Sequence, residues 1–259
     1  MTCRRAFGVL STAAIVATLV YGCSSGDAAR GVPADAGADG IATSDASAHD
    51  ASPGDSAITS CVPADVSTFQ PPTYVPASGA SQGKCTPAQI TTFYDDCLAP
   101  NSTQTTCAPF NGATATPENK ACYLCIITRD TDAKYGPVVE HKGVVSVNIP
   151  GCMELRDGSA GLVCAKAYQA ADGCHRAACA ANCPVIDDAS FQLYLACVQQ
   201  ASANGCKSYQ QGAACAASEA DSGTSGAGIC FQGQSFHDLY NSVVPIFCGS
   251  GPGDSGGGG

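Results

Sequence analysis

The chain has 259 residues and is acidic, with 12 Lys and Arg against 22 Asp and Glu and a formal net charge of −10. A nucleic-acid binder needs clustered basic residues to displace counterions from phosphates, and the sequence has no such cluster, so we expect no nucleic-acid partner. Trp is absent, which weakens a sugar-binding interpretation built on indole rings.

Residues 1–22 have the pattern of a secretory signal peptide. Arg4 and Arg5 precede an uncharged, apolar or small stretch from 6 to 21. This stretch is about 16 residues long, against the roughly 20 that span a bilayer. The two arginines also resemble a twin-arginine export signal, but we favour the general secretory route because folding before export suits a disulfide protein poorly.

The end of this segment resembles the lipobox of bacterial lipoproteins. Val20, Tyr21 and Gly22 precede Cys23, and Tyr21 is bulkier than that family usually has at this position. The resemblance implies cleavage before Cys23, a lipid on its sulfur, and a membrane as partner. Ser24 implies delivery to the outer membrane or cell surface of the bacterial envelope. The alternative is an ordinary signal peptide followed by a chance cysteine.

Residues 23–60 and 249–259 are low in complexity. The first range is rich in Ala, Asp, Ser and Gly, has six Asp against one Arg, and cannot bury enough apolar surface to fold. We therefore expect it to be a disordered tether, and the Gly-rich range 249–259 to be a disordered tail. The tail contains the sequence of a serine-protease nucleophile at 253–257, but no oriented base or following strand accompanies it.

Residues 61–248 form the predicted folded domain. Of the 18 cysteines, Cys3 and Cys23 lie before it, which leaves sixteen between Cys61 and Cys248. An even, dense set in an exported chain predicts a framework of disulfides.

The fold class that we expect is mainly α, with helical hairpins and one small β-hairpin. Apolar spacing, caps and glycines predict helices that open at Thr86–Pro87 and Thr116–Pro117, after Gly158–Ser159 and Gly173, after Asp187–Asp188, and at Ser235. Pro245 should kink or end the last helix. Residues 137–149 carry two Val-rich runs around 140–143 and predict the hairpin.

The cysteine spacing suggests a duplicated helical hairpin. Cys164 and Cys183 lie on either side of Gly173, and Cys197 and Cys215 lie on either side of Gly205, at similar distances. If each glycine ends a helix and the next helix packs back antiparallel, the outer cysteines come level. We therefore predict the disulfides Cys164–Cys183 and Cys197–Cys215, and leave the other pairings open.

Two groups of cysteines suggest redox or metal chemistry. Cys122 and Cys125 form a C-x-x-C motif, but inside a predicted helix and without a βαβ pattern. On a helix, the set Cys174, His175, Cys179 and Cys183 has metal-ligand spacing. Because an oxidising compartment removes thiolates, we favour structural bridges and assign no metal and no cofactor.

The histidines His141, His175 and His237 lack a nearby motif that would make them catalytic, so we assign no catalytic residue. The resemblance to lipoproteins with a cysteine-rich domain of unassigned activity favours a non-catalytic module that binds an unknown protein or small ligand or supports the envelope. The alternative is an extracytoplasmic enzyme with a site near Tyr135 and His141, or near His175. Such an enzyme predicts a pocket where His141 or His175 meets a carboxylate or hydroxyl.

Overall fold

The computed structural model describes residues 61–141, 144–185, 188–223, 226–233 and 235–250, and the backbone of 2–3 and 20–24. Within these ranges the protein is mainly helical and has one small sheet, as the sequence predicts. Most of the predicted signal peptide, tether and tail lies outside the described residues. No helix of the described part is long and apolar enough to cross a membrane.

The first helices form where the capping signals predict them. Helix α1 (Pro87–Phe93) starts with a capping box between Thr86 and Gln89 and continues into a π-helical turn, η1 (Tyr94–Leu98). After α2 (Gln104–Asn111), helix α3 (Pro117–Ile126) starts at the N-cap Thr116, whose side chain accepts from the Asn119 N–H. Local capping decides where these short helices begin.

The predicted hairpin is present, as β4 (Val138–His141) and β5 (Val144–Val147) in antiparallel register. Strand β3 (Ile127–Arg129) pairs in parallel with β4, which the sequence analysis missed because three residues show no alternation. On the other side of β5, the backbone of β2 (Val20–Ser24) pairs antiparallel with it, and β1 (Thr2–Cys3) pairs with β2. The order of the sheet is β1-β2-β5-β4-β3.

Helix α4 (Ile149–Cys179) consists of two helices that meet at a kink at Gly158, whose φ of 57° is not helical. The predicted helix after Gly158–Ser159 is therefore present, and the sequence analysis missed the first helix, which starts at the N-cap Asn148. Gly173 lies inside the helix instead of ending it. A Cβ there would come 3.5 Å from the Phe69 ring and 3.7 Å from Pro72. These are ordinary van der Waals distances, so a small side chain would also fit, and the strap packs over the helix at this position.

The chain after α4 returns along it in short helices. They are α5 (Asp188–Ala203), α6 (Lys207–Gly212), α7 (Cys215–Asp221), the 3₁₀ helix η2 (Gly226–Phe231) and α8 (Phe236–Cys248). Gly205 lies between α5 and α6, as predicted, and Ser235 and Asp238 form the predicted capping box of α8. Pro245 does not end α8, because it lies in the last turn, where the Gly249 N–H bonds its carbonyl.

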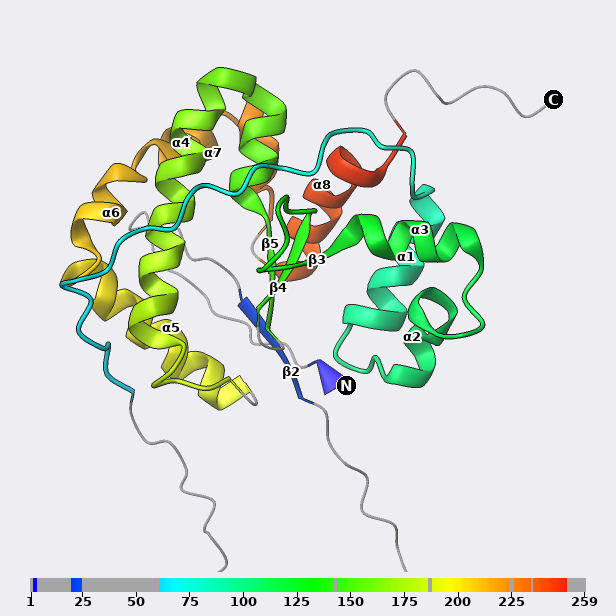
Figure 1. The fold of residues 1–259 in the computed structure, drawn as a ribbon, viewed down its shortest axis with the longest axis horizontal. Helices are drawn as coiled ribbons and strands as arrows, with labels where there is room; N and C mark the ends of the chain where they lie inside the picture. The colour runs from blue at the N-terminus through cyan, green and yellow to red at the C-terminus, as the bar shows by residue number, and fades with distance from the viewer. Residues whose placement is uncertain are drawn as a thin grey trace, which may run out of the picture.

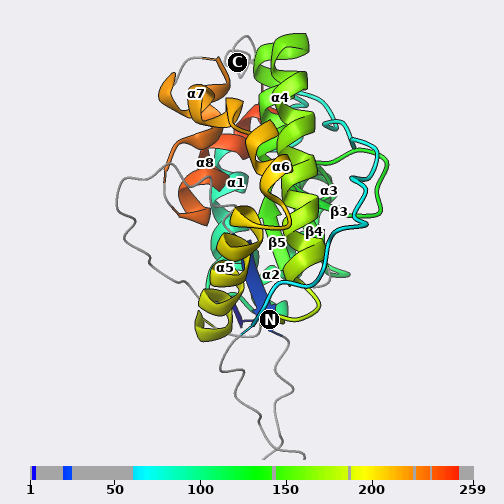
Figure 2. The same ribbon diagram turned by 90° about the vertical axis from the view of Figure 1, so that its left-hand side faces the viewer.

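The residues before α1 form a strap along α4, seen in cyan in Figures 1 and 2. This strap, residues 61–85, runs from the end of α4 towards its start. Ala64 donates to the Ala178 carbonyl, and the Val75 backbone exchanges two hydrogen bonds with the Gln169 side chain, at 2.8 and 3.2 Å. The long helix thus satisfies backbone groups in the first part of the strap, whereas Ser81 to Cys85 donate to carbonyls at the end of α8 and just after it.

Two hydrophobic cores lie on either side of the hairpin. The first core gathers Val138, Val145 and Val147 of the sheet with α1, α3, α8 and the first part of α4. The second core joins the last part of α4 to α5 and contains Phe191 and Tyr194. Figure 1 shows the strands between α4 and α8, so the small sheet separates the two cores.

Eight disulfides pair all sixteen cysteines of residues 61–248. In the first core the pairs are Cys85–Cys122, Cys97–Cys107, Cys125–Cys248, Cys152–Cys230 and Cys164–Cys215. In the second core they are Cys61–Cys183, Cys174–Cys206 and Cys179–Cys197. In the described part of the chain, no disulfide joins one set to the other.

Both predicted disulfides are therefore wrong. Cys164 pairs with Cys215, and Cys183 and Cys197 pair with other cysteines. The physical reason is that α4 continues through Gly173, so Cys164 and Cys183 lie far apart along one helical direction instead of level in a hairpin.

The two disulfide sets predict the outcome of a tryptic digest of the non-reduced, denatured protein, run near neutral pH with any free thiols blocked to prevent disulfide exchange. Trypsin cleaves after Lys166, Arg176 and Lys207, so the fragment 157–166 should remain joined to 208–259. Fragments 167–176 and 177–207 should form a second, separate assembly. Mass spectrometry distinguishes this result from a single assembly, which a Cys164–Cys183 or Cys197–Cys215 bridge would produce.

Candidate functional site

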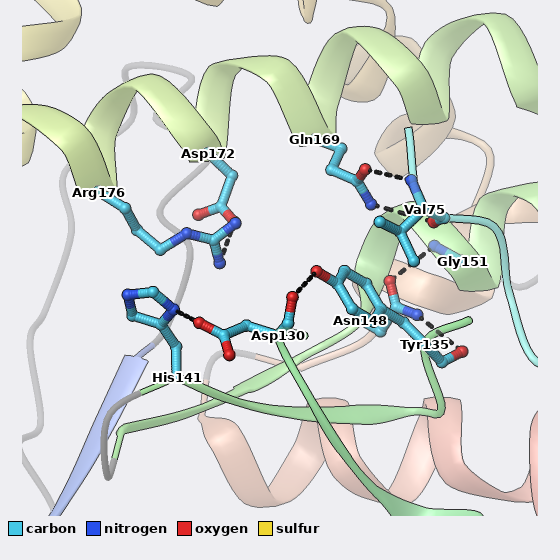
Figure 3. Close-up of polar contacts among 9 residues, drawn as sticks. All are labelled: Val75, Asp130, Tyr135, His141, Asn148, Gly151, Gln169, Asp172 and Arg176. Atoms are coloured by element: carbon cyan, nitrogen blue, oxygen red, sulfur yellow. Dashed lines mark hydrogen bonds and ion pairs between the residues drawn. The ribbon is translucent and has the colours of Figure 1, made fainter. Parts of the chain in front are cut away.

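A cluster of polar side chains lies between α4 and the sheet (Figure 3). His141, at the end of β4, makes an ion-pair contact through Nδ1 with the carboxylate of Asp130, just after β3. From α4 above, Arg176 makes an ion pair with Asp172 at 2.8 Å, one helical turn apart. The Tyr135 hydroxyl donates to the Asp130 carbonyl at 2.8 Å. Three separate elements thus present their charged groups to one another.

Buried amides hold these elements in place. Asn148 is buried at the start of α4, where its Oδ1 accepts from the Gly151 N–H and its Nδ2 donates to the Gly136 carbonyl, both at 2.9 Å. Its side chain therefore caps α4 and fixes the loop that carries Tyr135. Burial raises the pKa of Tyr135, an effect that Arg176 opposes and Asp130 supports.

A pocket opens beside this cluster, with a cavity volume of about 60 Å³, or room for about two water molecules. The sheet contributes one wall, and the end of α4, the following loop and α5 contribute the other. Its lining residues are His141, Val144, Ser146, Arg176, Ala180, Cys183, Val185 and Tyr194. The pocket, called here the His141 pocket, therefore lies between the sheet and the second core.

Tyr194 supplies a polar atom that the fold does not use. Its side chain is 5% exposed, and its hydroxyl has no hydrogen-bond partner among the described residues. Burial, and then the negative charge of Asp172, raise the pKa of the Tyr194 phenol, so the hydroxyl keeps its proton. Among the described residues only the Ser102 Oγ is a buried side-chain polar atom without a partner, so the Tyr194 hydroxyl is not costly as it stands, and a ligand in the pocket would add a hydrogen bond to it.

His141 meets the geometric condition that the sequence analysis set for an enzyme, since it lines a pocket and contacts a carboxylate. His175 meets only part of it. Its Nε2 lies 2.8 Å from the Ser202 Oγ, but that hydroxyl donates to the Val198 carbonyl at 2.8 Å. Because the single Ser202 hydroxyl proton goes to Val198, the Ser202 oxygen accepts from Nε2 of His175, so this nitrogen does not act as a base toward Ser202.

The other residues that the sequence analysis considered for redox, metal or catalytic chemistry are in disulfides or stack on another ring. Cys122 and Cys125 each pair with a distant cysteine, so the C-x-x-C motif does not form the internal disulfide of a redox site. Cys174, Cys179 and Cys183 are all in disulfides, which leaves no thiolate there for a metal. His237 stacks on Tyr94, with ring centroids 4.1 Å apart.

Comparison of the chain with protein family models, curated protein sequences and solved structures gives no match. The site therefore has to be interpreted from its own geometry. Sequence reasoning selected His141 and Tyr135 but missed Asp130, Arg176 and Tyr194. The only local signal among these is the i, i+4 pair of Asp172 and Arg176, which is common on helix surfaces.

The buried His175 predicts how stability depends on pH. Burial lowers its pKa below the ordinary value, with Asp172 opposing the shift and Arg176 adding to it. The unfolded chain therefore takes up a proton near pH 6.5 before the native state does, so His175 makes the free energy of unfolding fall as pH drops below about 6.5. H175N should flatten this part of the profile in urea unfolding at pH 5 to 7, whereas H237N should leave it unchanged. An equally steep profile in H175N would contradict the assignment.

Proposed function

We propose that this protein is a lipid-anchored lipoprotein of the bacterial envelope, most consistent with the outer membrane or cell surface, whose disulfide-linked domain binds a ligand in the His141 pocket. Cys23 carries the lipid, and residues 23–60 connect it to the domain.

The complete pairing of sixteen cysteines is the observation that carries this proposal. Disulfides persist in oxidising compartments, which supports export across the inner membrane. The pairing also consumes the thiols of residues 61–248. Thiol chemistry is therefore unavailable to this domain, and the His141 pocket offers polar side chains for recognition.

The position of the pocket supports binding. Small-ligand sites commonly occur where two separately packed units meet. Here the sheet meets the end of α4 and α5, and Val144 of the sheet packs against the second core, to which Val185 and Tyr194 of the other wall also belong. The partly exposed Arg176 and the unpartnered Tyr194 hydroxyl provide directed donors beside apolar side chains.

The anchor is tested by replacing Cys23. In cells fed radioactive palmitate, the C23S protein should lose all label and keep residues 1–22, because the sulfur that accepts the lipid before cleavage is missing. C3S is the matched control and should keep both label and membrane association. Labelled C23S protein, or a mature N-terminus elsewhere by mass spectrometry, would overturn the proposal of lipidation at Cys23.

The contact between His141 and Asp130 favours one second candidate, an enzyme that uses His141 as a general base. The carboxylate would orient the ring through Nδ1 and leave Nε2 to accept a proton.

The two candidates differ in their response to H141Q. If His141 is the base, H141Q lowers the turnover of a panel of nitrophenyl esters by about 100-fold or more, while H237Q does not. Equal, background turnover by the native protein and H141Q would exclude base catalysis by His141 on these substrates and favour the binding module.

A further inference from the structure

The outer edge of β5 accepts an added strand. Its inner edge pairs with β4, and the backbone of residues 20–22 pairs antiparallel with residues 144–146 on the outer edge. Cleavage before Cys23, which belongs to the proposed function, removes residues 20–22. The mature protein then presents the N–H and C=O groups of this edge without that strand, which makes the edge a template for another one.

The His141 pocket lies on one face of this edge. Directly opposed residues in an antiparallel pair point to the same face. Val144 and Ser146 line the pocket, whereas Val145 points into the first core. In a strand added to β5, the two residues opposite Val144 and Ser146 therefore reach the pocket, and the residue between them does not.

The polar groups of the pocket are mainly donors. Arg176 uses Nη1 for Asp172 and has further N–H groups, Tyr194 has an unpartnered hydroxyl, and Ser146 adds a second hydroxyl. An ionised carboxylate only accepts hydrogen bonds, and its bonds to a guanidinium are among the stronger ones. The cavity of about 60 Å³ has room for the end of such a side chain.

We propose that the mature protein binds an extended peptide segment of a partner protein, which adds antiparallel to β5 and places an Asp or Glu side chain in the His141 pocket. The inference rests on the proposed function, because removal of the leader vacates the edge. Main-chain hydrogen bonds to β5 supply sequence-independent affinity, and Arg176 with Tyr194 supplies the preference for the acidic side chain.

The charge of the whole chain does not attract such a segment, because it is −10. At physiological ionic strength, exposed charges more than about 8 Å away are largely screened. The preference for an acidic side chain therefore depends on short-range contacts in the pocket. Removal of a single contact atom, such as the Tyr194 oxygen, should weaken this preference.

The test uses the mature chain, residues 23–259 with C23S, secreted behind an ordinary signal peptide. The probe is a fluorescent peptide of residues 18–25 with C23S, in three forms: unmodified, V20E and Y21E. By the register of β2, position 20 faces Ser146 and position 21 faces Val145. Fluorescence anisotropy should show that V20E binds about tenfold more tightly than the unmodified peptide, while Y21E shows no gain.

Variants of the protein locate the effect. Y194F removes one oxygen and should reduce the V20E gain about fivefold, and R176Q should abolish it. R129Q, on the far edge strand β3, should leave it unchanged. No binding of any peptide, equal binding of V20E and Y21E, or a gain that survives in both Y194F and R176Q would overturn the inference. If the peptides fail to bind but Cys23 is labelled by palmitate, only the peptide-binding inference is refuted. If the peptides bind but Cys23 is not labelled, only the proposal of a lipid anchor on Cys23 is refuted.

Discussion

Helix α4 is the element on which both halves of the domain depend. It carries Cys152 and Cys164, which bind the first core, and Cys174 and Cys179, which bind the second. The elements attached to it are short: α6 has six residues and α7 has seven, lengths at which an isolated helix is unstable in water. Their structure therefore depends on cross-links and packing against α4. The disulfides contribute stability that other domains obtain by burying large apolar side chains.

Much of this fold was predictable where interactions between residues close in the sequence determine the structure. The capping boxes at Thr86 and Ser235 and the hairpin at 138–147 form as predicted, because their signals lie within a few residues. The prediction failed at Gly173, where a glycine suggests a helix end. There the strap fills the space beside the missing side chain, and the contact comes from residues about a hundred positions earlier. The wrong disulfides followed from that one error.

The site was less predictable than the fold. Asp130, His141, Arg176 and Tyr194 belong to four segments, and no spacing in the sequence relates them. Their meeting depends on the register of β4 with β3, and on α4 running straight past Gly173. His141 was selected only because it lies in a hairpin of otherwise apolar strands. Tyr194 looked like one more apolar position on α5, and only the structure shows that its hydroxyl has no described partner.

The pocket also lies close to Cys61, the first residue of the strap. Cys183 lines it, and the disulfide from Cys183 to Cys61 ties the first residue of the strap to that wall. The Cys61 sulfur also lies 3.0 Å from the Leu193 carbonyl oxygen of α5, next to Tyr194. A displacement of the strap at Cys61 would therefore reach the pocket wall through the disulfide to Cys183. The opposite wall, on β5, contains no cysteine. In the described chain no disulfide joins β5 to the wall with Tyr194. The ion pairs of His141 and Arg176 each stay on one side, His141 with Asp130 beside the sheet and Arg176 with Asp172 on α4. The separation of the two walls therefore depends on the packing of α4 and α5 against the sheet.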